Sequence, residues 1–483
     1  MAGEGEGFRS SSTAHTKFNP KPEEGSVLDL LIRDGQVVTE GRVVAADVGI
    51  VGEKVAGLYA PGTAPQAAQI YDAAGKYVLP GVIDVHFHCK YLSTVHVTFM
   101  DDLTQATASA AHGGVTTIVV FVWGNPGEAP GEYLSAFLKE ASELCYTDYA
   151  AHCGVRPEME NIRRLPEAFE LGVTSFKFHY DYRKTGGGRM TDDDHRLAAM
   201  EIIAARGGLA MFHCENGYMI DYLEDKFIAQ GKVTPEYFYP SRPNLAEAHS
   251  VYTTLVLSEL TGCPVYIVHL SAREALELII QAQARGKPVY AETCPQYLLL
   301  THEKVLEDWG LSKVGPPLRT AADNEAMWWG LQAGFIEIVG SDHAAMTVAA
   351  KRAAGQDIFK IPFGMPGTET MLPLLYSEGV VKGRISLPRL VQVLCENPAK
   401  RFGLWPRKGA LAVGSDADLV ILDPEVEWTI TAGELHAVSD YTSFEGWKVR
   451  GKPVASFLRG RPLLKDGRLQ VKPGYGVYLS RRA

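Results

Sequence analysis

Eight short apolar segments, each followed by a helical pattern, constrain the fold more than any other feature of this chain. They lie at residues 81–88, 116–122, 148–155, 175–180, 209–215, 265–271, 289–293 and 336–342. Alternation of buried strands with helices predicts repeated βα units around a parallel sheet, and eight such units close a barrel. Two helices are expected to begin with capping boxes, at Thr191 with Asp194 and at Ser271 with Glu274. We therefore predict an α/β fold built on a (β/α)8 TIM barrel.

Both ends of the chain carry a β pattern of a different kind. Between residues 27 and 77, β-branched runs are interrupted by Asp-Gly, Glu-Gly and Gly-Glu pairs, which indicates hairpins. A similar pattern returns in residues 406–470. We expect these two segments to pair into one small β-sandwich domain beside a barrel of residues 78–405. Residues 1–26, polar and rich in glycine, are expected to form a flexible tail, and residues 471–483 a second tail.

The composition excludes several classes of function. Of the 483 residues, 46% are hydrophobic and 22% are charged, which is typical of a soluble globular enzyme. The net charge of −10 gives no basic surface for nucleic acid or an anionic membrane. The seven cysteines have no CxxC spacing, and no apolar stretch resembles a secretion leader or a membrane span. We expect a cytoplasmic protein that acts on a small molecule.

Metal-binding residue types stand at or near the carboxyl ends of five of the eight segments. They are His86, His88, Lys177, His213, His269 and Asp342. Because the carboxyl ends of barrel strands form one rim, these side chains should converge there. Taken singly, a histidine is more often a hydrogen-bonded core residue, the lysine a salt-bridged one and the aspartate a helix cap. Coincidence would have to recur on separate strands, so we interpret the whole set as a metal site.

Four imidazoles and a carboxylate are too many ligands for one catalytic zinc ion, which must keep an open position. We therefore predict two divalent cations, zinc, with manganese, iron or cobalt as alternatives. Residues two apart on a strand face the same side, so His86 and His88 can bind one ion while Phe87 faces the helices. A lysine deprotonated by burial among cations could condense with carbon dioxide, and Lys177 would then be an anionic carbamate bridge.

These residues resemble those of the cyclic amidohydrolases of the amidohydrolase superfamily, and among them the dihydropyrimidinases and hydantoinases. The resemblance runs from LPGVIDVHFH to GSDADLVILD and includes VYIVHLSAREALE, AETCPQYLLLTHE, GPPLRT and GSDH. It implies that His86, His88 and Asp342 bind one ion, that His213 and His269 bind the other, and that a carboxylated Lys177 bridges them. It also maps Tyr182 onto the tyrosine that helps to polarise the scissile carbonyl.

The implied reaction opens the amide C–N bond of a cyclic diamide, such as a dihydropyrimidine or a hydantoin, to give a carbamoyl amino acid. A hydroxide bridging the two metals would attack the amide carbon, since coordination lowers the pKa of bound water to about 7. Tyr182 would stabilise the oxyanion, and Asp342 would carry a proton to the leaving nitrogen. Because such relatives are usually tetramers, we expect a homo-oligomer, a tetramer or a dimer, with residues 471–483 reaching across subunits.

Three positions depart from the family where the substrate is held. Gly315 stands where hydantoinases often have serine and dihydroorotases asparagine, and Phe363 stands where the family commonly has asparagine. Lys90 stands where dihydroorotases and allantoinases usually have arginine, and it could bind an acidic group of the substrate. A solvated lysine on a rim loop is the alternative for Lys90. With Tyr182, these are the predicted substrate-binding residues.

Two alternative functions stay open. Gly315 and Phe363 enlarge the apolar character of the pocket, which allows hydrolysis of an acyclic amide, carbamate or urea on the same binuclear site. A non-catalytic scaffold, like the collapsin response mediators, would share the fold but lack the metal ligands. The complete set of six ligands argues against a scaffold.

Overall fold

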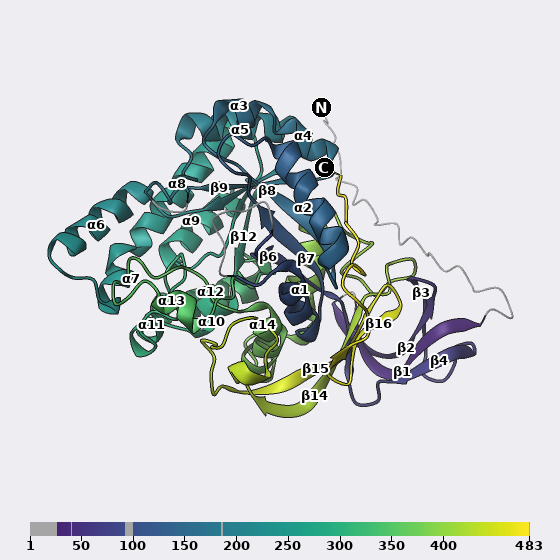
Figure 1. The fold of residues 1–483 in the computed structure, drawn as a ribbon. Coiled ribbons are helices and arrows are strands. Elements are labelled where there is room, and N and C mark those ends of the chain that lie inside the picture. The colour runs from purple at the N-terminus through teal and green to yellow at the C-terminus, as the bar shows by residue number, and fades with distance from the viewer. Residues whose placement is uncertain (1–26, 40, 92–99, 185–186, 483) are drawn as a thin grey trace, which may run out of the picture.

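Two β-sheets organise the molecule, an eight-stranded parallel sheet surrounded by helices and a nine-stranded sheet beside it (Figure 1). The computed structural model describes residues 27–39, 41–91, 100–184 and 187–482. Within these ranges, none of the helices combines the length and the apolar character needed to span a lipid bilayer.

The eight-stranded sheet forms the barrel. Its strands are β6 (Val82–Phe87), β7 (Val115–Val122), β8 (Asp148–Gly154), β9 (Ser175–His179), β10 (Leu209–His213), β11 (Val265–Ile267), β12 (Val289–Thr293) and β13 (Ile338–Val339). Neighbouring strands are parallel throughout. The two edges meet just beyond β13, where His88 donates its backbone N–H to the carbonyl of His343 at 2.9 Å. The predicted (β/α)8 barrel is confirmed.

Helices follow the strands and cover the outside of the barrel (Figure 1). The longer ones are α1 (Leu103–His112), α2 (Pro130–Leu144), α5 (Asp193–Ala204), α6 (Gly217–Ala229), α8 (Asn244–Thr261), α9 (Arg273–Ala284) and α12 (Ala321–Ala333). Short helices fill the connections: α3 (Met159–Arg163), α4 (Pro166–Glu170), α7 (Phe238–Ser241), α10 (Pro295–Leu299), α11 (Glu303–Glu307), α13 (Val348–Arg352), α14 (Thr368–Leu374), α15 (Leu387–Val391) and α16 (Asn397–Arg401).

The two predicted capping boxes are wrong. The residues that cap α5 and α9 are Asp192 and Ala272, and neither makes a side-chain hydrogen bond to its helix. The side chain of Thr191 bonds elsewhere, to a carbonyl of the preceding strand. Ser271 donates its hydroxyl and its N–H to Glu247, because this fully buried carboxylate needs donors more than the helix end does.

Side chains of the barrel strands alternate between the interior and the layer beneath the helices. Val119 and Phe121 of β7 share an interior core with Met211 of β10. Their neighbours Val120 and Phe212 belong to the larger core between strands and helices. This two-residue period fixes which positions can reach the centre of the barrel.

The nine-stranded sheet joins both ends of the chain. Its strands are β1 (Leu28–Thr39), β2 (Arg42–Val51), β3 (Lys54–Tyr59), β4 (Ala67–Asp72), β5 (Tyr77–Pro80), β14 (Leu419–Thr429), β15 (Lys448–Leu458), β16 (Arg461–Lys465) and β17 (Arg468–Leu469). The ends meet where β5 pairs antiparallel with β14. Tyr71 and Phe457, on distant strands of the sheet, contact edge to face at 5.5 Å, so the sheet folds over one shared core.

The boundary between the two domains differs from the expected one after residue 77, and one segment of the terminal domain packs on the barrel. Strand β5 continues the terminal sheet to Pro80, so the barrel begins with β6. Between β14 and β15 the chain leaves the sheet, and Ile430 and Phe444 pack with Phe238 and Met365 of the barrel. The terminal domain therefore also covers loops at one side of the barrel.

The C-terminal segment packs against its own barrel (Figure 1, yellow). Leu479 donates its N–H to the carbonyl of Tyr149 at 2.8 Å, and its side chain is buried in the interior core. Arg481 donates to the Ser175 hydroxyl at 3.0 Å. Because Tyr149 and Ser175 begin their strands, residues 471–482 close the amino-terminal end of the barrel. The expected contact of this segment with another subunit stays a prediction.

Candidate metal centre

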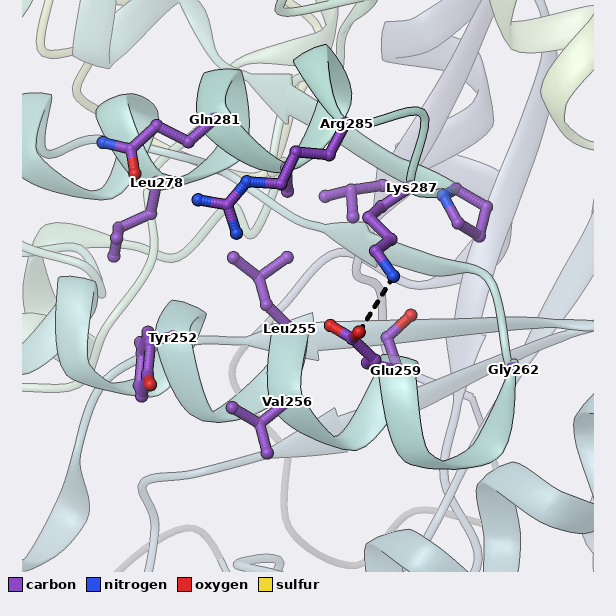
Figure 2. Close-up of a pocket in the computed structure, with 13 residues that line it drawn as sticks. Tyr252, Leu255, Val256, Glu259, Gly262, Leu278, Gln281, Arg285 and Lys287 are labelled. Atoms are coloured by element: carbon purple, nitrogen blue, oxygen red, sulfur yellow. Dashed lines mark ion pairs between the residues drawn. The ribbon is translucent and has the colours of Figure 1, made fainter.

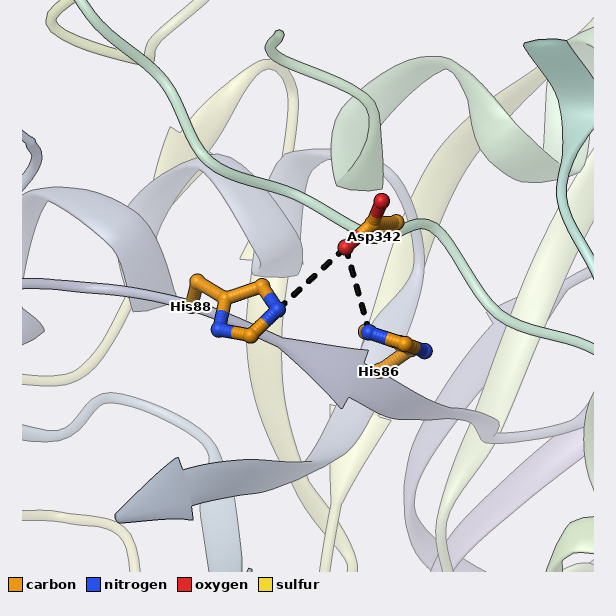
Figure 3. A group of neighbouring side chains, drawn as sticks. All are labelled: His86, His88 and Asp342. Carbon is orange, nitrogen blue, oxygen red and sulfur yellow. Dashed lines mark ion pairs between the residues drawn. The ribbon is translucent and has the colours of Figure 1, made fainter. Parts of the chain in front are cut away.

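His86, His88 and Asp342 meet at the carboxyl rim of the barrel (Figure 3). The Nε2 atom of His86 lies 3.1 Å from Oδ1 of Asp342, and the Nε2 atom of His88 lies 3.2 Å from the same oxygen. His86 is fully buried, whereas the side chain of Asp342 is 13% exposed. Two ring nitrogens and a carboxylate therefore face a common point that is open on one side, as a cation with an exchangeable position requires.

A local irregularity in β6 turns both histidines inward. Val85 belongs to the interior core, so strict alternation would point His86 toward the helices. The register between β6 and β7 shifts between Asp84 and Phe87, and this shift restores His86 to the interior together with His88. Asp84 accepts the backbone N–H of Ser341 at 3.0 Å, which ties β6 to the segment that carries the aspartate.

His213 and His269 form the second part of the site. Nδ1 of His213 lies 2.9 Å from Nε2 of His269, and their ring centroids are 4.6 Å apart. The ring of His269 also lies 5.1 Å from that of His86. The four predicted histidines are thus contiguous, although they come from three different strands or the loops that follow them.

Lys177 lies beside the first pair of histidines. It is 1% exposed, and its Nζ lies 4.7 Å from the centre of the Phe121 ring. The same ring packs against His86 at 4.6 Å and against His88 at 5.2 Å. The amine has no hydrogen-bond or ion-pair partner among the described residues. Burial lowers its pKa from the ordinary value to about 8.

Carboxylates behind the histidines direct a free nitrogen of each ring into the site. Glu292 contacts Nδ1 of His86, and Glu215 contacts Nε2 of His213 at 2.8 Å. A ring nitrogen that donates to a carboxylate leaves the lone pair on the other nitrogen. The nitrogen left over on His86 is Nε2, which faces the Asp342 carboxylate at 3.1 Å. The nitrogen left over on His213 faces His269.

The protonation of the two residues on the open side also suits a metal. Burial lowers the pKa of His88 to about 4, so its imidazole is neutral near pH 7. For Asp342, burial alone would raise the pKa, but His86 and His88 together hold it well below its usual range. A neutral imidazole and an ionised carboxylate are the forms that bind a divalent cation. The residues present therefore fit two such ions.

Glu292 supports the candidate site and was not among the residues predicted from the sequence. Besides contacting His86, it accepts the Tyr266 hydroxyl at 2.7 Å and the backbone N–H of His269 at 3.2 Å. It is fully buried near the end of β12. A charged residue inside an otherwise apolar strand was the available signal, since glutamate is seldom fully buried without a partner.

Three of the four predicted substrate residues lie next to His213. The Tyr182 ring is 6.0 Å from the His213 ring and meets Phe363 edge to face at 6.2 Å. A Cβ added at Gly315 would lie 3.2 Å from the Phe363 ring and 3.7 Å from the His213 ring. These residues therefore form one wall beside the predicted ligand.

Lys90 is the fourth predicted substrate residue, and the structure does not bring it into contact with this wall. Its backbone N–H donates to the carbonyl of Asp101 at 2.7 Å. Its side chain makes no hydrogen bond or ion pair with the described part of the chain. The role of Lys90 stays a prediction.

Three predicted site residues have a left-handed backbone conformation, which residues other than glycine rarely adopt. The φ angles of Tyr182, His269 and Asp342 are 59°, 38° and 52°. Left-handed conformations of this kind cost about 1–3 kcal/mol each and persist where the surrounding structure imposes them. These conformations direct the three side chains toward the centre of the rim. The residue types at these positions did not predict them.

One acidic cluster is already filled, and one groove lies apart from this site. The acidic group of Asp148, Asp416 and Asp418 surrounds the amine of Lys408, which occupies the place of a cation. A groove lies between α8 and α9 on the outside of the barrel (Figure 2). Its volume is about 330 Å³. No predicted site residue lines this groove.

A third group of possible ligands adjoins the site. His179 lies with Asp181 close to His213. Nδ1 of His179 is 3.0 Å from the Asp181 carboxylate, whose other oxygen lies 3.2 Å from Nε2 of His213. Arg242 also approaches this carboxylate, at 3.6 Å. This arrangement orients His213 in the same way as Glu215 does.

Known proteins with the same architecture carry names that agree with the resemblance. The D-hydantoinase of Rhizobium radiobacter is 39% identical over 460 residues, covering 94% of this chain and 99% of that protein. The L-hydantoinase of Paenarthrobacter aurescens is 34% identical, with the same coverage of 94% and 99%. The crystal structure of the dihydropyrimidinase from Brevibacillus agri superposes with a TM-score of 0.89 at 34% identity, covering 94% of this chain and 98% of that one.

A family model matches most of the chain, from residue 77 to residue 463, and its description is the amidohydrolase family. The matched range includes the whole barrel, every predicted metal ligand and the strands β14 and β15 of the terminal sheet. The resemblance inferred from the sequence motifs is thereby confirmed. The chain belongs to the amidohydrolase family.

Proposed function

We propose that this protein is a metal-dependent hydrolase that opens the amide C–N bond of a cyclic diamide, a dihydropyrimidine or a hydantoin, to give a carbamoyl amino acid. The observation that carries the proposal is the convergence of four imidazoles, a carboxylate and a buried lysine at one rim. The names of the relatives, D-hydantoinase, L-hydantoinase and dihydropyrimidinase, supply the substrate class.

The proposed ligands form two groups with one bridge. His86, His88 and Asp342 would hold one ion, and His213 and His269 the other. Lys177 would be carboxylated and lie between them, which its burial and its lack of a partner among the described residues favour. When bound, the ions supply positive charge that activates water and polarises the substrate carbonyl. Zinc is our first choice, with manganese, iron or cobalt as alternatives.

Asp342 and Tyr182 are the proposed catalytic residues. Asp342 is ionised, and its partly exposed carboxylate can accept a proton from the attacking water and return it to the leaving nitrogen. Burial raises the pKa of the Tyr182 phenol, so the hydroxyl keeps its proton and can donate a hydrogen bond to the carbonyl oxygen as negative charge develops there.

The wall formed by Tyr182, Gly315 and Phe363 is proposed to hold the substrate ring. Gly315 has no side chain, so the ring can approach the backbone of that loop. The Phe363 ring is half-buried and gives the wall an apolar face. Lys90 remains a candidate for a charged group at the edge of the substrate.

A hydrolysis panel on the metal-loaded protein tests the proposal. The panel contains dihydrouracil, hydantoin, 5-substituted hydantoins, dihydroorotate and allantoin, together with acyclic ureas, amides and carbamates. We expect turnover of dihydrouracil or a hydantoin, and about two metal ions per chain. Turnover of an open-chain substrate alone would replace the proposal with the acyclic alternative. Absence of bound metal after purification and metal loading would support a scaffold instead.

We also propose a cytoplasmic location and a homo-oligomer, a dimer or a tetramer. All seven cysteines are free and buried, which suits a reducing compartment. Sedimentation of the purified protein distinguishes the oligomer from a monomer.

A further inference from the structure

Arg189 lies at the edge of the candidate site, in the loop that follows β9. The centre of its guanidinium stacks on the Trp123 ring, with 4.6 Å between Cζ and the ring centroid. Trp123 packs against His179 at 5.2 Å, and His179 packs against Tyr182 at 4.8 Å. Two aromatic side chains, those of Trp123 and His179, thus lie between the guanidinium and the proposed catalytic tyrosine.

The charge of Arg189 is not matched by an acidic side chain. It makes no ion pair or hydrogen bond with the described residues, and its Nε is buried without a partner. Residues 92–99 and 185–186, which the structure does not describe, contain no aspartate or glutamate. Burial lowers the pKa of Arg189, and the more distant Asp181 carboxylate does not offset this effect.

Neighbouring arginines are paired, which makes Arg189 distinctive within its own loop region. Arg183 contacts Asp221 at 2.7 Å, and its side chain is 44% exposed. Arg156 contacts Glu158 at 3.6 Å and donates to a backbone carbonyl at 2.8 Å. Arg189 is partly buried, and a cation that has lost part of its water without gaining an acidic partner is costly, so its retention favours a ligand that supplies negative charge.

We propose that Arg189 binds a carboxylate on the ring substituent of the substrate. This inference rests on the proposed function and narrows it to cyclic diamides with an acidic side chain. A guanidinium matches a carboxylate with two parallel N–H donors, and stacking on Trp123 fixes the plane in which those donors point. The role is one of binding and specificity, distinct from the chemistry at the metal ligands.

A matched pair of substrates tests the charge alone. Hydantoin-5-acetic acid and its carboxamide have nearly the same shape and differ in net charge. We expect the KM of the metal-loaded protein to be at least about tenfold lower for the acid, in line with a charge-assisted hydrogen bond. Arg189→Gln should remove that preference by raising the KM of the acid, with little change in the KM of the carboxamide.

Arg183→Gln is the matched control, because it removes the same charge from the same loop at an exposed position. It should keep the preference for the acid, and Arg189→Lys should keep part of it. Equal KM values for acid and carboxamide in the unmodified protein would overturn the inference. An Arg189→Gln variant that keeps the preference would also overturn it.

A binding measurement separates this inference from the proposed function. Calorimetric titration of both compounds into the metal-loaded Tyr182→Phe protein, in which ring opening is expected to be slow, reports affinity with little heat from turnover. Tighter binding of the acid, lost in Arg189→Gln, would support the anion site even if no substrate of the panel were hydrolysed. Equal binding of both compounds would reject the anion site while leaving ring hydrolysis intact.

Discussion

Glu292 illustrates how a residue that touches no substrate can set the properties of the candidate metal centre. Its carboxylate contacts His86, Tyr266 and the backbone of His269, so one side chain orients residues of both proposed ion sites. Glu292→Gln should keep the shape but weaken the hold on the His86 ring. We expect metal affinity to fall by about 10- to 100-fold, measured by competition with a chromogenic chelator.

The control for this prediction is Glu325→Gln on α12. Glu325 is an exposed glutamate that pairs with Arg384 at 2.9 Å and is not among the predicted site residues. It should leave metal affinity unchanged. An unchanged affinity in Glu292→Gln would show that Glu292 does not govern the orientation of His86.

Tyr182 offers a second test at the level of a single hydroxyl. Because the phenol is expected to donate only as the oxyanion develops, Tyr182→Phe should lower kcat by about 10²- to 10³-fold. The KM should change little, and metal content should stay the same. Steady-state kinetics on the best cyclic substrate, with metal analysis of the same sample, check this. If Tyr182→Phe raised KM and left kcat unchanged, Tyr182 would act in substrate binding and would have no part in the proposed mechanism.

At the residue scale, the sequence predicted the candidate metal ligands better than it predicted the residues and backbone conformations that orient them. His86, His88 and Asp342 are predictable because their types recur at the ends of strands, a pattern that the barrel brings together. A charged residue inside β12 marks Glu292 as unusual, but residue type and spacing do not tell that it contacts His86, which lies on another strand. The left-handed backbone of Tyr182 has no signature in residue type or spacing.

Among the elements, the segment that carries Phe363 is held by two buried lysines. Lys313 donates to the carbonyls of Ile358 and Ile361, both at 2.7 Å. Lys351 donates to the carbonyl of Pro362 at 2.9 Å. Burial lowers the pKa of Lys351 to about 7, so this amine is only partly protonated at neutral pH and still donates hydrogen bonds. These bonds fix a loop that has no regular secondary structure.

Lys351→Met should loosen this segment and displace Phe363 from the wall beside His213. We expect KM to rise by about three- to tenfold with a smaller change in kcat, because one or two hydrogen bonds are lost away from the reacting atoms. Lys360→Met, on the same segment with a side chain that is 73% exposed, is the control and should leave KM unchanged. A fall in kcat with constant KM would contradict a positioning role.

The strands could be predicted from the sequence, but their register shifts and the caps of the helices could not. All eight predicted strands are present, because short β-branched runs between helical patterns are a strong local signal. The register shift in β6 and the caps of α5 and α9 were not predicted. Each of these depends on a partner in another segment, as Ser271 shows by bonding to Glu247.

On the scale of the whole molecule, one buried lysine connects the terminal sheet to the barrel. The amine of Lys408 lies 2.6 Å from Asp148 of β8, 2.6 Å from Asp418 and 2.9 Å from Asp416. Lys408→Met would leave the buried Asp418 without its cation, whereas Asp148 keeps Arg459 and Asp416 keeps Lys54 and Arg407. We expect a loss of about 3–5 kcal/mol in the free energy of unfolding. Urea denaturation measures this. Lys400→Met, at a residue that is 47% exposed, should cost less than about 1 kcal/mol.

The same cluster predicts how the stability of the molecule depends on pH. Burial alone would raise the pKa of Asp416, but Lys408 and Lys54 lower it to about 2. Because the pKa in the folded protein lies below the usual value of about 4, this carboxylate stabilises the fold above pH 4. That contribution is lost as the pH falls from about 4 toward 2, where the folded form also takes up the proton.

Asp416→Asn removes this titration while keeping the shape of the side chain. The difference in unfolding free energy between the unmodified protein and the variant should be largest at pH 5 and should shrink steadily toward pH 2.5, as measured by urea denaturation at each pH. Glu425→Gln, whose side chain is 75% exposed and pairs with Arg450, should show a small difference at every pH. A difference for Asp416→Asn that stays constant with pH would mean that its charge does not hold the terminal sheet against the barrel.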